Sequence, residues 1–277
     1  MIKQLYNKSE QIFLSKIKYL YPRVEQNPVL VNSFPKSGTH LLYQIFWKFN
    51  HLYKFKTFIA SHPSTYKSER KNKTTNLLIE NILNGELVRG HIFYNEMSEK
   101  ILINKNIIHI FIYRDPRDVV ISEANYLNKM NKFHYLYKYF SKINNLNDRI
   151  TFSIKGNDFI KTNGNYKNIY NRYMDYINWI KSENCYCIKY EDLVGINKKK
   201  HLLNIIEYYL KNSKFIYDKE ELVKIVEKSI DPNKSHTFHS GGTQKWKTFF
   251  NDENKKLFKD YAGDLLIKLG YEKDYDW

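Results

Sequence analysis

Two short segments constrain the fold of this chain more than any other feature. SFPKSGTH (residues 33–40) and YRDPRDVVIS (residues 113–122) each read as the end of a strand, a loop of cations, hydroxyls or turn formers, and the start of a helix. The first amides of a helix have no internal partner, and the macrodipole makes that end positive, so each junction suits an anion. Two such junctions predict a ligand that carries two separated phosphates.

Apolar and β-branched stretches alternate with stretches of helical periodicity along the chain. Strands are predicted over residues 29–34, 86–92, 107–113 and 184–190. Helices are predicted over residues 4–20, 38–50, 74–83, 166–182, 198–211, 219–230 and 252–269, with a further helix opening at Asp115. This alternation is typical of an α/β fold with a mostly parallel sheet, in which ligands bind at the carboxyl ends of the strands.

The segments between these elements are predicted to be loops. Residues 61–76 and 231–248 are polar, and residues 130–165 are rich in Asn and Tyr with weak periodicity, which indicates a flexible insert. The sequence shows no internal repeat and no clear boundary. We expect one domain over residues 1–277, with residues 1–27 as an N-terminal helical extension.

The charge of the chain favours anionic ligands but does not indicate nucleic acid. The formal net charge is +16, from 45 basic and 29 acidic residues. Only seven of the basic residues are Arg, and the longest run of Lys is residues 198–200. A nucleic-acid-binding protein needs a coherent basic face interleaved with aromatics, whereas these Lys are scattered.

The sequence also indicates where the protein works and which groups it lacks. No apolar run approaches the roughly 18 residues that span a membrane, and the N-terminus lacks the pattern of a signal peptide. We therefore expect a cytoplasmic protein. Cys185 and Cys187 share a face of a predicted strand and are expected to be buried thiols. Without a nearby His they do not make a zinc site, so no metal is expected.

The first loop differs from that of nucleotide hydrolases. Gly38 permits a tight turn, Lys36 supplies a point charge, and Ser37 and Thr39 supply hydroxyls. A P-loop NTPase needs GxxxxGK[ST], but here the Lys precedes the Gly and no Walker-B pattern appears. These departures disfavour an ATP or GTP hydrolase and a nucleotide kinase.

The second segment supplies a complementary pair of phosphate ligands. Arg114 lies at the predicted strand end, and Ser122 follows after the first turn of the helix. Arg can bind a phosphate through its fork and Ser through its hydroxyl, so the two can hold one phosphate between them.

Together the two segments resemble those of the PAPS-dependent sulfotransferase family, most closely its cytosolic and bacterial members (PAPS is 3′-phosphoadenosine 5′-phosphosulfate, and PAP is the product without the sulfuryl group). PKSGTH is similar to the loop that binds the 5′-phosphosulfate end, and YRDPRDVVIS to the segment that binds the 3′-phosphate. The similarity continues through Tyr190–Leu193 and residues 242–250 to GDLLIKLGY at residues 263–271. The resemblance implies a P-loop-like three-layer fold, a central parallel sheet flanked by helices, PAPS as sulfuryl donor and no metal.

Two residues are candidates for catalysis. His91 follows a predicted strand, and the resemblance places there the catalytic His of a K-x-H motif, with Arg89 in place of the Lys. An unperturbed imidazole titrates at about pH 6.5, which suits a general base. Lys36 is the candidate for stabilising the charge that develops on the leaving oxygen.

The resemblance assigns the remaining ligands of the donor. It gives the 5′-phosphate to Lys36, Ser37, Gly38, Thr39 and His40, where His40 departs from the Thr that relatives often carry. It also places Tyr190 on the adenine side.

A departure concerns the 3′-phosphate. Aligned on Trp246, the chain has His239, Ser240 and Gly241 where relatives often have an Arg, a Lys and a Gly that close over this phosphate. Two cations are lost, so weaker binding of PAPS is expected unless Lys234 or Lys245 substitutes.

The leading hypothesis is a sulfotransferase that moves a sulfuryl group from PAPS to a hydroxyl or amine by in-line transfer with a His general base. The alternative is a catalytically silent PAP-binding or scaffold protein of the same fold. The acceptor stays open among a small molecule, a lipid headgroup and a saccharide. The dimerisation signature of relatives is not recognisable, which leaves the oligomeric state open.

Overall fold

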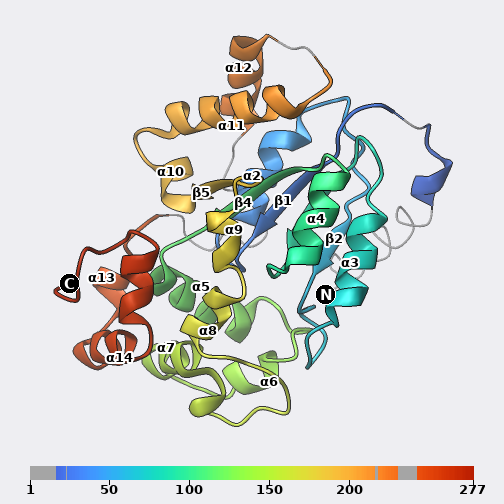
Figure 1. Ribbon diagram of the computed structural model, residues 1–277. Helices are drawn as coiled ribbons and strands as arrows, with labels where there is room; N and C mark the ends of the chain where they lie inside the picture. Colours follow the sequence, from blue (N-terminus) through green and yellow to red (C-terminus); the bar gives the residue numbers. More distant parts are fainter. Residues whose placement is uncertain (1–16, 23, 216–217, 230–241) are drawn as a thin grey trace.

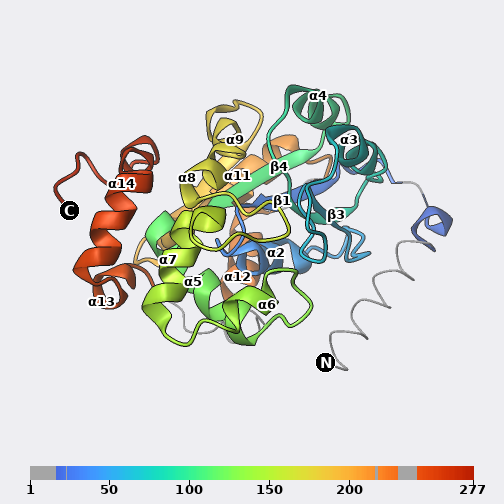
Figure 2. The same cartoon turned by 90° about the horizontal axis from the view of Figure 1, so that it is seen from below.

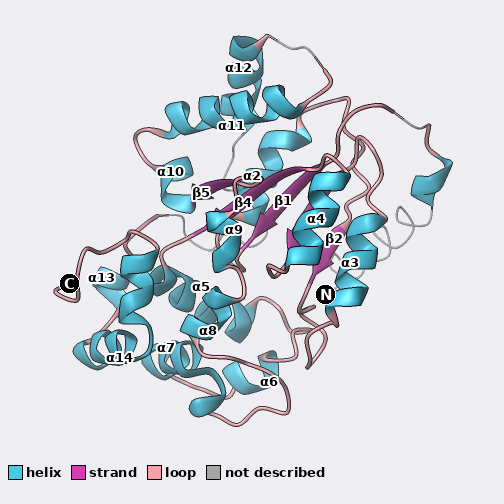
Figure 3. Ribbon diagram, in the orientation of Figure 1, coloured by secondary structure: helices cyan, strands magenta, loops and turns pink. Residues whose placement is uncertain are grey.

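A five-stranded, all-parallel sheet forms the centre of the molecule (Figures 1 and 3). The structure is a computed structural model that describes residues 17–22, 24–215, 218–229 and 242–277. The strands are β1 (Val29–Ser33), β2 (Phe58–Ala60), β3 (Leu87–His91), β4 (Ile108–Tyr113) and β5 (Tyr186–Lys189), in the order β2-β3-β1-β4-β5. The parallel sheet and its flanking helices confirm the predicted fold class.

The central strands are buried on both faces. Every residue of β1 and of β4 is buried, as their continuous apolar runs predict for the middle of a parallel sheet. β1 pairs with β3 on one side and with β4 on the other, so that Asn32 lies opposite both Gly90 and Phe111. The three strands therefore end at the same edge, and the loops that follow them meet there.

Helices cover both faces of the sheet. They are α2 (Thr39–Trp47), α3 (Asn72–Glu80), α4 (Glu96–Asn104), α5 (Pro116–Lys129), α6 (Tyr137–Phe140), α7 (Leu146–Lys155), α8 (Ile169–Met174), α9 (Ile177–Lys181), α10 (Tyr190–Val194), α11 (Lys198–Asn212), α12 (Lys219–Ser229), α13 (Trp246–Phe249) and α14 (Asp252–Lys268). Short 3-10 helices cover Lys18–Leu20 and Gly156–Asp158. One apolar core joins Val31 of β1 to α2, α11 and α12, and the other joins Leu30 to α4, α5, α7, α9 and α14.

The prediction of a flexible insert over residues 130–165 was wrong. This segment forms α6 and α7, which pack against α5, and α7 also contacts α14 (Figure 2). Phe140, Phe152 and Ile154 are fully buried in the core. The segment anchors itself with a few large side chains on short helices, which explains why no long periodic pattern is visible in the sequence.

Other boundaries differ in smaller ways. The helix expected over 166–182 is two helices, α8 and α9, separated at Asp175 and Tyr176. The loop expected over 61–76 ends earlier, because α3 begins at Asn72, and the loop expected over 231–248 gives way to α13. β2 and α4 were missed, although Asn95 caps α4 by accepting a hydrogen bond from the Ser98 amide at 2.8 Å.

The N-terminal helix predicted over 4–20 lies largely outside the described residues, and the single-domain organisation stays a prediction. The two cysteines are free thiols with their Sγ atoms 3.7 Å apart; Cys185 is buried as expected, whereas Cys187 is partly exposed. None of the helices in the described ranges combines the length and the apolar character that crossing a bilayer requires.

Candidate active site

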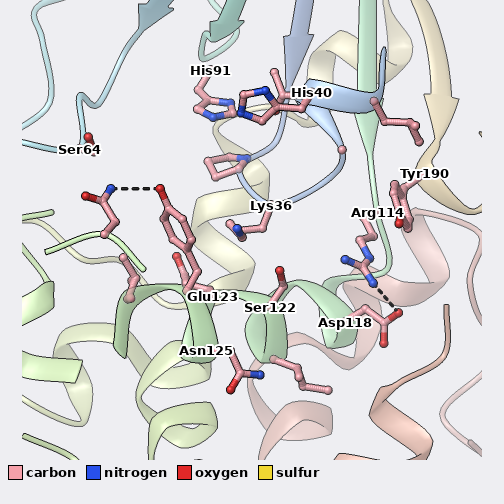
Figure 4. Close-up of a pocket in the computed structure, with 18 of the residues that line it drawn as sticks. Lys36, His40, Ser64, His91, Arg114, Asp118, Ser122, Glu123, Asn125 and Tyr190 are labelled. Carbon is pink, nitrogen blue, oxygen red and sulfur yellow. Dashed lines mark hydrogen bonds and ion pairs between the residues drawn. The ribbon is translucent and has the colours of Figure 1, made fainter. Parts of the chain in front are cut away.

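A cavity of about 490 Å³ opens where the loops after β1, β3 and β4 leave the sheet (Figure 4). Much of its lining comes from the two segments singled out in the sequence, residues 33–40 and 113–122, from the end of β3 and from one face of α5. Topology thus brings together segments that are far apart in the sequence. This position matches the general rule that ligands of open α/β folds bind beyond the carboxyl ends of the strands.

The first loop has a backbone that only glycine suits at its tightest point. Gly38, the N-cap of α2, has a φ of 99°, and a Cβ built there would lie 2.7 Å from the Tyr190 ring. The turn therefore brings the start of α2 directly against Tyr190. Thr39 is held at this start by a 2.6 Å hydrogen bond between its hydroxyl and that of Ser33.

Lys36 occupies the middle of this loop and has a positive φ of 67°, a conformation uncommon for residues other than glycine. Its Nζ lies 3.7 Å from the centre of the Tyr126 ring, a cation–π contact across the cavity. Burial lowers the pKa of Lys36 to about 7, against the opposing attraction of Glu123 and with a further decrease from Arg114. The protonation of the Lys36 amine is therefore sensitive to its surroundings, and a nearby anion favours the ammonium form.

His91 is oriented by a backbone carbonyl. Its Nδ1 lies 2.9 Å from the carbonyl oxygen of Ser33, which can only accept, and 3.0 Å from the Ser33 hydroxyl, which can accept as well. A proton on Nδ1 satisfies both contacts, so we assign Nδ1 as the donor. The lone pair is then on Nε2. Burial lowers the pKa of His91 to about 4, with smaller contributions that include the nearby cations Lys36 and Arg89, so the ring is neutral at neutral pH. A neutral imidazole of fixed tautomer that lines the cavity is able to act as a base.

Arg114 and Ser122 both line the cavity, one at the end of β4 and the other on α5 (Figure 4). The guanidinium of Arg114 lies over the Tyr190 ring at 4.5 Å, and its Nη2 donates to Asp118 at 3.1 Å and to the Gly242 carbonyl at 3.0 Å. These contacts fix the direction of the fork. The structure therefore brings Arg114 and Ser122, the pair predicted to bind a phosphate, to the same cavity as the first loop.

Asp118 links α5 to the C-terminal loop. Besides pairing with Arg114, it accepts a 3.0 Å hydrogen bond from the backbone amide of Trp246. The chain just before α13 is thereby drawn to the cavity, where Lys245 joins the lining. Lys245 is one of the two cations that the sequence offered in place of the lost Arg and Lys.

The structure places most, but not all, of the predicted site residues in the lining of the cavity. Lys36, Gly38, Thr39, His40, His91, Arg114, Ser122 and Tyr190 line the cavity. Ser37 is outside this lining: its side chain is fully buried, and its amide donates to the Phe34 carbonyl at 3.2 Å. His239, Ser240 and Gly241, and Lys234, lie outside the described residues.

Sequence reasoning missed the wall that α5 and its neighbours build. Glu123 and Tyr126 line the cavity from α5, and His62, Ser64 and His134 do so from loops. For the α5 residues a signal was present. Tyr126 is four residues after Ser122, so the two share a face of any helix that opens at Asp115.

Comparison with known proteins identifies the family. The sulfotransferase domain model matches residues 26–270. Among solved structures, mouse sulfotransferase SULT7A1, complexed with PAP, is 17% identical with a TM-score of 0.58, over 90% of this chain and 89% of that one. Retinol dehydratase, in complex with androsterone and inactive cofactor PAP, is 14% identical with a TM-score of 0.56, over 93% and 85%.

These two likenesses concern the fold, since their identities are low. The search of curated proteins returned no match. The family model spans nearly all of the chain, including both phosphate-loop segments and His91. The protein therefore belongs to the sulfotransferase domain family, as the two motifs indicated.

Proposed function

We propose that the protein transfers a sulfuryl group from PAPS to a hydroxyl or amine acceptor, with His91 as general base and Lys36 as the stabiliser of the leaving group. Membership of the family carries the reaction type. The observation that carries the mechanism is the hydrogen bond from His91 Nδ1 to the Ser33 carbonyl, which presents a neutral imidazole in the cavity between the two phosphate-binding segments.

The donor end of the cavity has the groups that PAPS requires. In this proposal Arg114 and Ser122, which line the cavity, bind the 3′-phosphate through a guanidinium fork and a hydroxyl. The first-turn amides of α2, together with Thr39 and His40 of the lining, bind the 5′-phosphate. The two sulfotransferase-fold neighbours hold PAP, which is the product that PAPS leaves behind. Ser37 contributes to this arrangement as part of the buried turn.

Lys36 is suited to the leaving group because its charge depends on its surroundings. On the face of Tyr126 its pKa is about 7, while two or more phosphate charges close by favour the ammonium form. As the bond between sulfur and the bridging oxygen breaks, negative charge grows on that oxygen. An ammonium that moves from the aromatic ring to this oxygen stabilises the transition state more than the ground state.

His91 completes the proton balance. The acceptor O–H or N–H gives its proton to Nε2 while the new bond to sulfur forms, and the sulfur–oxygen bond to the phosphate breaks, so that PAP leaves with its electron pair. The carbonyl of Ser33 stabilises the imidazolium that results, because Nδ1–H continues to donate to it. The low pKa of His91 keeps the base unprotonated before each turnover.

The first test combines binding and transfer. Calorimetric titration with PAP, using ATP and AMP as controls, is expected to show selective binding of PAP. His91→Ala should keep that binding and lose transfer by roughly 100- to 10,000-fold, the usual contribution of a general base. The matched control is His201→Ala, because His201 lies on α11 beside Asp192 and does not line the cavity.

Two results would contradict the proposal. Equal affinity for ATP and PAP would remove the donor assignment and favour a general nucleotide-binding or scaffold role. Simultaneous loss of transfer and PAP binding in a folded His91→Ala protein would remove the base assignment. The cytoplasmic location remains our expectation from the sequence.

A further inference from the structure

The carboxylate of Glu123 is an unusual component of a cavity otherwise rich in cations. It lies on α5, next to Ser122, on the opposite side of Lys36 from His91 in Figure 4. The lining of this cavity also includes Lys36, Arg89, Arg114, Lys245 and a second carboxylate, Asp118, which is paired with Arg114. Among the described ion pairs, Glu123 is not paired with a cation of the lining, and its charge repels an anionic donor, which points to a different ligand for it.

One oxygen of Glu123 is fully engaged. Oε2 accepts hydrogen bonds from the Ser153 hydroxyl at 2.5 Å, the Tyr166 hydroxyl at 2.9 Å and the Arg172 guanidinium at 2.6 Å. These donors come from α7, α8 and the segment between them. Three donors on one oxygen fix the carboxylate in a single orientation.

The other oxygen faces the cavity. Within the described parts of the chain all hydrogen bonds to Glu123 end on Oε2, while 11% of its side chain stays exposed and the residue lines the cavity. Burial opposes ionisation, but Arg172 and the hydrogen bonds outweigh it and hold the pKa of Glu123 below its usual value. Oε1 is therefore a charged, oriented acceptor that can receive one more hydrogen bond.

We propose that Glu123 is a specificity-determining residue that receives an O–H or N–H of a second polar group on the sulfuryl acceptor. The preferred acceptors then carry an additional hydroxyl or amino group besides the one that reacts, as sugars and amino alcohols do. This inference rests on the proposed function. An acceptor without such a group covers Oε1 without pairing it, which is the situation that gives strong discrimination.

A competing role for Glu123 is to hold Lys36. The two side chains attract each other, yet no contact within 4.0 Å joins them among the described ion pairs, and Lys36 lies on Tyr126 instead. If Glu123 acted only through Lys36, its loss would slow the reaction of every acceptor equally. A role in selection changes the ratio between acceptors, so the two roles are separable.

The test uses three phenols that differ only at the end of their side chain: para-ethylphenol, tyrosol with a hydroxyl, and tyramine with an ammonium. With wild-type protein and PAPS, kcat/KM for tyrosol or tyramine should exceed that for para-ethylphenol by about tenfold or more. A higher value for tyramine identifies a cation as the preferred group, and a higher value for tyrosol identifies a hydroxyl. Glu123→Gln should bring the ratio close to one.

Controls separate selection from folding. Ser153→Ala removes a donor to Oε2 but leaves Oε1 in place, and it should keep the wild-type ratio. If Glu123→Gln does not fold, Glu123→Asp, which retains the charge beside Arg172 on a shorter arm, should still lower the ratio.

Three results would overturn the inference: equal kcat/KM for the three phenols, an equal decrease for all three in Glu123→Gln, or no transfer to any of them by protein that binds PAP. Absence of PAP binding would instead reject the proposed function.

Discussion

The donor and acceptor sides of the cavity are built on different principles. The proposed donor side consists of two strand–loop–helix junctions, and its ligands lie in the loop or in the first two turns of the helix that follows each strand. The acceptor side is a wall in which Glu123 of α5 is held by residues 30 to 49 positions away in the chain. Local geometry forms the first, whereas the packing of short helices forms the second. Loss of an ion-pairing side chain should therefore act mainly on PAP binding at the donor side and mainly on stability at the acceptor side.

The largest effect is expected on the free energy of unfolding, from Arg172→Met on the acceptor side. This change leaves the buried carboxylate of Glu123 without its cation, and breaking one partner of a buried pair typically costs about 3–5 kcal/mol. Chemical denaturation should show this decrease. A decrease below 1 kcal/mol would mean that the network does not hold this wall.

The stabilisation from the Glu123–Arg172 ion pair should depend on pH. Because the folded state lowers the pKa of Glu123, the stabilisation it contributes is present at neutral pH and is lost as pH falls below the ordinary range of a Glu, through the lowered pKa. The stability difference between wild type and Arg172→Met should shrink in that acid range. A difference that stays constant down to pH 2 would contradict the linkage.

On the donor side, Arg114→Ala should act on binding. Loss of a charge-assisted hydrogen bond to a phosphate costs about 1.5–3 kcal/mol, or roughly a 10- to 100-fold higher Kd for PAP. Arg114→Lys keeps the charge without the fork, so its Kd for PAP should lie between those of wild type and Arg114→Ala. Titration calorimetry measures both, and equal affinities of the Ala variant and wild type would mean that the 3′-phosphate binds elsewhere.

Gly38→Ala should produce a smaller effect on the same side. The positive φ and the approach of a Cβ to Tyr190 strain the first loop, at a cost of about 1–2 kcal/mol in stability together with weaker PAP binding. Gly270→Ala is the matched control, because Gly270 also has a positive φ, of 67°, but a Cβ there would meet only the Lys189 amine at 3.6 Å. If both variants bind PAP equally, the contact with Tyr190 is unimportant for the donor.

The smallest effect is a change in the pH profile. For the free enzyme, kcat/KM should decrease below about pH 4, where His91 becomes protonated, and above about pH 7, where Lys36 loses its charge. Lys36→Arg keeps a charge and should move the alkaline limb upwards. An alkaline limb that is unchanged in this variant would assign it to another group.

What the sequence could predict follows the same division between local patterns and long-range packing. Four of the five strands and the Gly38 turn were predicted correctly, because short-range patterns encode them. Lys36, His91, Arg114 and Ser122 line one cavity, and their roles in the site stay predictions. The family assignment, which rests on the same two segments, is confirmed as well. The segment of residues 130–165 was misread, since α6 has only four residues and the Asn- and Tyr-rich stretches around α7 hide its pattern, while both helices pack against α5. Ser37 was expected beside the phosphate; its side chain is fully buried and outside the cavity lining, and its role stays a prediction.

The sequence by itself determined the donor chemistry of this protein, because each strand end, turn and helix start carries the cations, hydroxyls and amides that suit an anion. Distant residues complete the site, since Tyr190 and the Gly242 carbonyl orient Arg114. Only the tertiary structure decided two further features. It set the tautomer of His91 through a carbonyl on β1, and it left a single oxygen of Glu123 facing the cavity. Both depend on which strands and helices become neighbours, and a linear pattern does not contain that information.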